Sequence, residues 1–428
     1  MTQVTNEAKL HMFLIHRVNH LIRKRCPVSA SLALLAILCS RPASAQTVTT
    51  TPGLSLAETI NQLMGPIAAT PVGQAIGLAT SLEVATSPLS NSAAGFVFKV
   101  DPTTGLKVRT ATTFGPSFAE RALTSGEGKV SVGVSFTSAN YSRLGDLKLE
   151  RMQLSSGTGN SPAAARTGLS SLVILAETLV IGGSMGVTDN LDIAVGVPLV
   201  RVKVDGISWV QNRNGDVFLL TKGSGISSGV GDISLTGKYR LLGFGKGVPD
   251  PGGLAAVATV RIPTGDPDNL RGFGITRTLV SLAASGGQGR FRPHANGGFE
   301  YWSDGVKAVT DFKQGTSVTA RHQVQWAAGL EFEAAPKLTL IVDVLGRNIL
   351  GAGKVGFKTS PAADNPFGVT SYTSAVALPE GIQKLTLVPG LKLNLKGNML
   401  LSLNGLTAIR DTGLHNRFTP VVGIDVTF

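Results

Sequence analysis

The chain has 428 residues, of which 52 are glycine and 15% are charged, and its formal net charge is +12. The basic residues are spread along the chain and do not form the patch or stripe that nucleic-acid binding requires, so no nucleic-acid partner is predicted. The low charge content, together with a sequence that has no long apolar run, argues against both a disordered chain and a helical membrane protein.

The first 45 residues are predicted to be an export signal. Basic residues between Arg17 and Arg25 precede an apolar stretch at 29–38, which is too short to cross a bilayer as a helix. A membrane anchor is the alternative interpretation of this stretch, and cleavage is expected after Ala45. Both cysteines of the chain fall in this segment, so the mature chain is expected to have no disulfide and no thiol ligand. The signal holds six of the 39 basic and one of the 27 acidic residues, which leaves 33 and 26, a net charge of +7.

Residues 46–112 are predicted to be a partly helical segment that precedes a barrel and is a candidate plug for it. A capping box at 55–58 (SLAE) predicts a helix that runs through Met64. A second short helix is expected over 71–85, where small residues dominate. Two short apolar runs at 96–100 and 106–110 flank a turn sequence (DPTTG) and predict a hairpin.

Residues 113–428 are predicted to form an all-β, antiparallel transmembrane β-barrel. From Lys129 onwards, apolar and polar residues alternate in segments of about ten residues, the length that a tilted strand needs to cross a bilayer. A soluble sandwich or propeller is the alternative, but its strands would average nearer five or six residues. We predict twelve strands, at roughly 128–137, 171–187, 191–204, 230–241, 253–262, 276–285, 291–302, 320–333, 336–346, 383–396, 399–410 and 418–428.

The last strand carries the clearest pattern. Pro420, Val422, Ile424, Val426 and Phe428 share one face, and mostly polar residues occupy the other. An outer-membrane barrel closes with such a strand, which predicts the bacterial outer membrane, in a Gram-negative organism, as the location and membrane lipid as a partner. We also expect the barrel-assembly machinery to bind this strand through its end at Phe428.

The connections alternate between short and long along the chain, as they do in barrels with short periplasmic turns and longer external loops. An additional alternating piece at 146–150 is assigned to a hairpin within the first external loop. The phase of the alternation slips near Leu199-Val200-Arg201, which predicts a β-bulge.

Two sequence patterns are candidate sites of chemistry. The pattern G-x-S-x-G at 225–229 resembles a nucleophile elbow around Ser227, but an elbow needs a helix after it, and a strand is predicted there. His294 and His322 would be the candidate partners of a catalytic serine. With His415 they are the three histidines of the mature chain and show no paired spacing, so no transition-metal site is predicted.

Charged residues in the barrel strands are predicted to face the lumen, because a charge on the lipid face is costly. Asp266, Asp268 and Asn269 would bind a divalent ion weakly, although a solvated external loop is the preferred interpretation. No catalytic residue, cofactor or metal is therefore predicted. The candidate lumen-facing residues are Asp192, Asp232, Lys238, Arg240, Arg261, His294, Asn296, Glu300, Gln323, Gln325, Glu331, Asp343, Lys392, Asn394 and Lys396.

Several stretches between residues 114 and 300 resemble the outer-membrane transporter-like family described as a meta-pathway of phenol degradation. They are FGPSFAERAL at 114–123, GVTDNLDIAVGVP at 186–198, GDISLTGKYR at 231–240, and RIPTGD at 261–266 with HANGGFE at 294–300. The resemblance implies an outer-membrane barrel and a small-molecule solute of aromatic or other apolar character, and it brings no catalytic residues.

The function expected from the sequence is a channel for passive passage of small molecules through a narrow polar lumen. A lumen enclosed by twelve strands is too narrow for the wide pore of a general porin. Two alternatives remain open at this stage, namely an outer-membrane hydrolase and a non-conducting structural or adhesion barrel.

Overall fold

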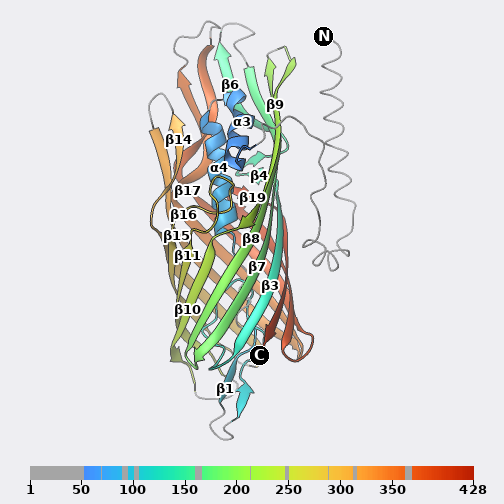
Figure 1. Cartoon of the computed structure of the whole chain (residues 1–428), viewed down its shortest axis with the longest axis vertical. Coiled ribbons are helices and arrows are strands. Elements are labelled where there is room, and N and C mark those ends of the chain that lie inside the picture. The colour runs from blue at the N-terminus through green and yellow to red at the C-terminus, as the bar shows by residue number, and fades with distance from the viewer. Residues whose placement is uncertain are drawn as a thin grey trace.

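The computed structural model describes residues 53–68, 70–88, 95–100, 106–159, 166–212, 214–245, 250–287, 289–311, 316–361 and 369–428. The predicted export signal lies outside these residues. The described part is a single antiparallel barrel with two helices inside it and a small hairpin at one end (Figure 1).

Twelve strands form the closed wall, as the alternation predicts. The ring closes because β20 pairs with β3 on one side and with β18 on the other. Every neighbouring pair is antiparallel, so the predicted fold class is confirmed. In chain order the wall strands are β3 (Val130–Tyr141), β7 (Arg166–Thr188), β8 (Leu191–Asn212), β10 (Ile233–Gly243), β11 (Gly253–Ile262), β12 (Arg277–Ser285), β13 (Phe291–Trp302), β15 (Thr316–Ala335), β16 (Leu338–Pro361), β17 (Val369–Asn394), β18 (Met399–Asp411) and β20 (Phe418–Thr427).

The two ends of the barrel differ in their connections, as predicted. At one end, β7 turns into β8 and β15 into β16 through two residues each. We call this the short-turn end, and in outer-membrane barrels it faces the periplasm. The hairpin formed by β1 (Phe98–Val100) and β2 (Lys107–Arg109) lies at the same end, which confirms the hairpin expected there (Figure 1).

Additional strands extend the opposite, long-loop end. One small sheet confirms the hairpin expected near residues 146–150, since β4 pairs with both β5 and β19. The remaining three strands lengthen the wall beyond the twelve-strand ring by pairing with β7 and β17, with β8, or with β15. The six additional strands are β4 (Arg143–Leu144), β5 (Leu147–Lys148), β6 (Met152–Gly159), β9 (Val217–Val230), β14 (Val306–Asp311) and β19 (Leu414–His415).

The predicted bulge near Leu199–Arg201 is wrong. The pairing of β7 with β8 runs through these residues without a register shift, and so does the pairing of β8 with β9. What changes is the polarity of the two faces. Ile193 points outward and is 45% exposed nearer the short-turn end, whereas Val202 points inward and is fully buried beyond the slip. The change in polarity therefore marks where the inner face of β8 begins to pack against helices.

The two predicted helices are present and fill the long-loop half of the barrel. They are α3 (Leu56–Ala68) and α4 (Thr70–Thr86), and we refer to them as the helix pair. The capping box forms as expected, because Glu58 accepts the Ser55 N–H at 2.8 Å and donates its own N–H to the Ser55 hydroxyl. The helices that the structure describes are too short or too polar to cross a membrane.

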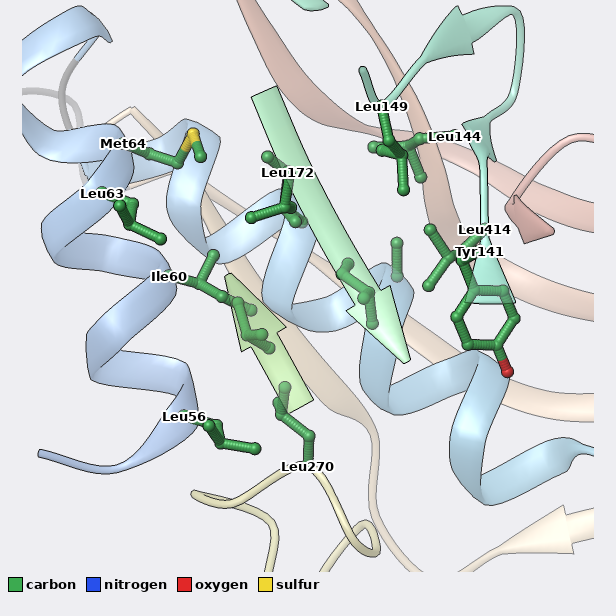
Figure 2. Close-up of a cluster of buried hydrophobic side chains, with 14 of the residues drawn as sticks. Leu56, Ile60, Leu63, Met64, Tyr141, Leu144, Leu149, Leu172, Leu270 and Leu414 are labelled. Atoms are coloured by element: carbon green, nitrogen blue, oxygen red, sulfur yellow. The ribbon is translucent and has the colours of Figure 1, made fainter. Parts of the chain in front are cut away.

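One face of α3 provides a large part of the core. Figure 2 shows Leu56, Ile60 and Leu63 directed from α3 towards Leu172 of β7 and Leu270 of the β11–β12 loop. All five side chains are at most 2% exposed. This apolar burial inside the barrel explains why the inner face of β7 and β8 changes from polar to apolar along their length.

Gly206 on the inner face of β8 carries no side chain and so leaves room for α3 to pack against the wall, and we call this position the seat of α3. A Cβ atom at Gly206 would lie 2.8 Å from Leu63 Cδ1 and 3.0 Å from Leu172 Cδ1. We predict that Gly206→Leu loosens α3 by about 1–3 kcal/mol, since the extra side chain overpacks the seat. Hydrogen exchange of residues 56–68 should accelerate while the barrel keeps its heat-resistant mobility on gels.

Gly237→Leu is the matched control, because a Cβ atom at Gly237 has no heavy atom within 4 Å. Equal acceleration in both variants would contradict the assignment of Gly206 as the seat of α3.

Candidate functional site: the barrel interior

The stretch between β2 and β3 lies inside the short-turn half of the barrel. We call residues 113–125 the inner loop. It forms no helix or strand, and five of its backbone N–H groups are instead satisfied by side chains of the wall. These bonds join Phe114 to Thr339 (3.1 Å), Gly115 to Glu331 (3.0 Å), Glu120 to Asn296 (2.9 Å), Ala122 to Ser285 (3.1 Å) and Ser125 to Asp192 (2.9 Å).

Charged groups reinforce this docking. Lys238 Nζ of β10 lies 3.3 Å from the Glu120 carboxylate of the inner loop. The Lys392 ammonium of β17 donates to the carbonyl oxygens of Phe114 and Pro116 at 3.3 and 2.8 Å. Because these wall groups are buried and bonded to the inner loop, the loop and the wall depend on each other for polar satisfaction.

Glu331 joins the inner loop to a cluster of buried charges in the wall. Its carboxylate accepts the Gly115 N–H and lies 3.5 Å from His294 Nδ1 and 3.9 Å from the Arg121 guanidinium. His294 bonds through its other ring nitrogen to Asp343 at 2.8 Å. All four ionisable side chains are almost completely buried, so each depends on the opposite charges beside it for stabilisation.

The helix pair is fixed by a separate set of charges on β16 and β17. Arg347 donates to the Thr86 carbonyl and, at 2.9 Å, to the Thr86 hydroxyl at the end of α4. Its guanidinium also lies 3.8 Å from the Glu83 carboxylate, which pairs with Lys384. A cation at the C-terminal end of a helix is favourable because the last carbonyl groups are unpaired and partly negative.

A third network lies in the wall on β10 to β13. Arg277 contacts Asp232 at 3.1 Å and Glu300 at 3.5 Å, and Glu300 also pairs with Arg261. The indole N–H of Trp302 donates to Glu300 at 2.8 Å. These charges neutralise one another, and they hold the four short strands together above the cavity described below.

At the rim of the short-turn end, Asp250 ties the hairpin to the wall. Its carboxylate is fully buried and binds Arg240 at 2.6 Å and also Lys99 of β1. Burial by itself would raise the pKa of Asp250. The hydrogen bonds from Arg240, Lys99 and the Gly252 N–H outweigh burial and hold the pKa of Asp250 below its usual value.

A cavity of about 190 Å³ borders both the inner loop and the residue just after α4, and we call it the central cavity. We include the inner loop, which follows residue 112, in the pre-barrel segment. Phe118 and Glu120 line it from the inner loop, and Pro88 lines it just after α4. The wall contributes hydroxyl and amide groups together with three cations, from Lys238, Arg261 and Arg347. A second cavity of about 30 Å³ shares Pro88, Val180 and Arg261 with it and also touches α4.

The structure places most of the candidate lumen residues in these networks. Those in the wall strands or next to them are buried or half-buried. Lys396 differs, because β17 ends at Asn394 and Lys396 lies exposed in the following turn. Several buried or half-buried charges of the interior are not among the predicted residues, namely Glu83, Arg121, Asp250, Arg277, Arg292, Arg347, Lys384 and Asp425.

The phase of the alternation could have found some of the missed residues. Arg347 is in phase with Asp343, and Lys384 is in phase with Lys392, so each continues a pattern already assigned to the inner face. Arg121 gave no such signal, because it lies outside any strand.

The motif around Ser227 lies within β9 and is followed by β10 rather than by a helix. His322 adopts a positive φ of 59° and stacks on Tyr301 with ring centroids 5.0 Å apart. It also accepts the Trp302 N–H at its Nδ1 atom, at 3.1 Å. The hydrogen bonds of His294 to Asp343 and of His322 to the Trp302 N–H therefore involve other partners than Ser227.

Asp266 serves the loop itself. Its carboxylate accepts hydrogen bonds from the Asn269 side chain at 2.7 Å and from Arg271 at 3.1 Å. Hydrogen bonds, first of all from the Asn269 side chain, lower the pKa of Asp266. Among the described residues there is no cluster of three or more His, Cys, Asp or Glu side chains arranged to hold a metal ion.

A closed barrel with an apolar outer belt and a charged interior is a bacterial outer-membrane β-barrel. The model of the family described as "Putative MetA-pathway of phenol degradation" matches residues 155–363, which confirms the predicted family resemblance. No curated protein matches the chain.

Several solved structures are similar to this chain. An outer membrane channel from Pseudomonas putida F1 is 12% identical, with 72% of this chain and 98% of that chain covered and a TM-score of 0.42. The toluene transporter TbuX from Ralstonia pickettii is 14% identical, with 81% and 99% covered and a TM-score of 0.33. A FadL homologue from Pseudomonas aeruginosa is 10% identical, with 81% and 98% covered and a TM-score of 0.30.

Proposed function

We propose that this protein is an outer-membrane channel for passive passage of small molecules, and that its pre-barrel segment closes it. The observation that carries the proposal is the central cavity, a space of mixed polar and apolar lining inside a closed barrel, which the inner loop borders on one side and Pro88, just after α4, on another. Transport of this kind involves no chemical step, and it needs only that the two parts of the segment move.

The proposed plug is larger than residues 46–112. The helix pair occupies the long-loop half, and the inner loop, which follows residue 112, occupies the short-turn half. A solute would therefore meet two obstacles in series. We propose that the candidate lumen residues act chiefly by holding these obstacles in place, through the ion pairs and hydrogen bonds described above.

We further propose solutes with a single aromatic ring. The central cavity measures about 190 Å³, compared with roughly 150 Å³ for an engineered cavity that binds benzene. Its hydroxyl and amide groups would satisfy a polar substituent on such a ring, and its apolar side chains, among them Phe118 and Leu345, would contact the ring itself. The description of the matched family, which refers to phenol degradation, supports the same class.

The proposed partners follow from the outer surface and from the end of the chain. Large apolar side chains that point outward, such as Leu282 and Phe299, suit contact with the lipid of the outer membrane. The terminal strand, which ends at the 67% exposed Phe428, is the proposed recognition element for the barrel-assembly machinery.

Staged truncation in planar bilayers tests the channel. We expect the mature chain to be nearly silent, removal of residues 46–112 to give small conductance steps, and removal of residues 46–125 to give the largest steps. The reason is that the shorter deletion leaves the inner loop bound to Glu331 and Asp192.

Folded barrels would be selected by heat-dependent mobility on gels before each measurement. If neither truncated form conducts nor admits solutes into liposomes, the channel proposal fails and a structural or adhesion barrel replaces it.

A further inference from the structure

We infer that the central cavity is a binding site for a small aromatic carboxylate, and that binding there releases the pre-barrel segment from the wall. The inference rests on the proposed channel function and adds to it the charge of the ligand and the trigger for opening.

The cations of the central cavity also hold the pre-barrel segment in place. Lys238 pairs with Glu120 of the inner loop at 3.3 Å. Arg347 donates to the carbonyl and the hydroxyl of Thr86 at the end of α4. One cavity thus contains the wall-side anchor of each part of the segment, although the two parts are far apart in the sequence.

The third cation, Arg261, pairs with Glu300 of the wall rather than with the segment. Two carboxylates, those of Glu120 and Asp192, oppose the three cations around the cavity. Asp192 is already occupied, because it accepts the N–H and the hydroxyl of Ser125. The Glu83 carboxylate also lies 3.8 Å from Arg347, so the charges around the cavity are close to balanced, and what favours an anionic group on the ligand is the set of cationic donors that line the cavity.

A ligand carboxylate would compete directly with the anchors. The Arg347 guanidinium is planar with five N–H donors and binds a carboxylate through two parallel hydrogen bonds, which are stronger than its bonds to a neutral carbonyl and a hydroxyl. Once Arg347 turns to the ligand, the end of α4 loses the donor for its last carbonyl. A carboxylate near Lys238 would likewise displace Glu120, and the inner loop would lose its ion pair to β10.

Size limits the rest of the ligand to about one ring. A cavity of about 190 Å³ accommodates a benzoate-sized anion but not a long acyl chain. Phe118 and Leu345 line the cavity and offer apolar surface to such a ring. Benzoate is therefore the probe, and benzyl alcohol, which has a similar size and no charge, is its matched control.

The test uses the full mature chain, with calorimetric titration in detergent and conductance in planar bilayers. Benzoate should bind and should raise the open probability several-fold, and benzyl alcohol should bind at least about tenfold more weakly because it lacks the charge-assisted hydrogen bonds. Equal effects of the two probes, or no binding of benzoate, would overturn the inference without reference to any variant.

Two variants separate ligand binding from loosening of α4. Arg347→Gln should open more often without ligand and should bind benzoate about tenfold more weakly. Lys384→Gln removes a different anchor, the partner of Glu83, and Lys384 does not line the central cavity. It should also open more often, and it should bind benzoate at least as tightly as the wild type does, because a ligand that favours the open form binds that form more tightly. A normal benzoate affinity in Arg347→Gln would contradict the assignment.

The outcomes also distinguish this inference from the proposed function. If the truncated chains conduct but benzoate does not change the conductance of the full chain, the proposed channel function is supported and the carboxylate trigger is wrong. If no form of the protein conducts, the channel itself fails, whatever the titration shows.

Discussion

Replacing Glu331 by leucine is expected to free the inner loop and to destabilise the barrel by about 3–5 kcal/mol, the usual cost of removing one partner from a buried ion pair. Glu331 is 1% exposed, accepts the Gly115 N–H and lies within 4 Å of both His294 and Arg121. Leucine would leave two cations and one N–H donor buried without this acceptor. The unfolding temperature, followed by the heat-dependent shift in gel mobility, should fall, and channel openings should become more frequent.

Glu333→Leu is the matched control, because Glu333 carries the same charge on the same strand and face but is only half-buried. Its effect should stay within about 1 kcal/mol. Glu331→Gln should fall between the two, since it keeps an acceptor for the Gly115 N–H and loses the negative charge. If Glu331→Leu and Glu333→Leu had the same effect on opening, Glu331 would not be the anchor of the inner loop.

Removing residues 418–428 is expected to abolish the closed barrel. Strand β20 pairs with β18 over nine residues and with β3 over seven, so its loss exposes two edges of unpaired backbone within the membrane. No heat-resistant, membrane-inserted form should be recovered. Retention of such a form would mean that β18 and β3 can close the ring without β20.

The single change Phe428→Ser separates stability from assembly. The Phe428 side chain is 67% exposed, while its backbone bonds to Val130 need no particular side chain. The refolded barrel should therefore keep its stability within about 1 kcal/mol. In cells, however, most of the protein should fail to reach the outer membrane if the assembly machinery reads the terminal aromatic residue. Normal outer-membrane levels would contradict that proposed partner.

The sequence was sufficient for the barrel wall because every wall strand obeys the same local rule. A residue that faces lipid must be apolar, and the next residue, which faces the interior, is free to be polar. This period of two located a part of each of the twelve strands, the terminal strand and the short turns, although β16 runs on to Pro361 and β17 begins at Val369, well beyond the predicted ends at 346 and 383. The helices were equally accessible, because the capping box at Ser55 is a local signal that needs no tertiary partner.

The same rule failed near Leu199, and the failure is informative. From an inward apolar residue the alternation rule predicts a change of register, but the register is unbroken. The rule assumes that water lies inside the barrel and lipid outside, and both assumptions end where β8 rises past the membrane and meets α3. Only the packed structure shows that Val202 and Val204 face a helix pair rather than solvent.

By itself, the sequence determined the class of protein, the number of strands and the presence of a pre-barrel segment, since each follows from patterns among near neighbours in the chain. The tertiary structure decided where that segment lies and what holds it. Gly115 and Glu331 are 216 positions apart, and Thr86 and Arg347 are 261 apart. No periodicity links residues at such separations, because barrel closure brings them together only after the whole ring has formed.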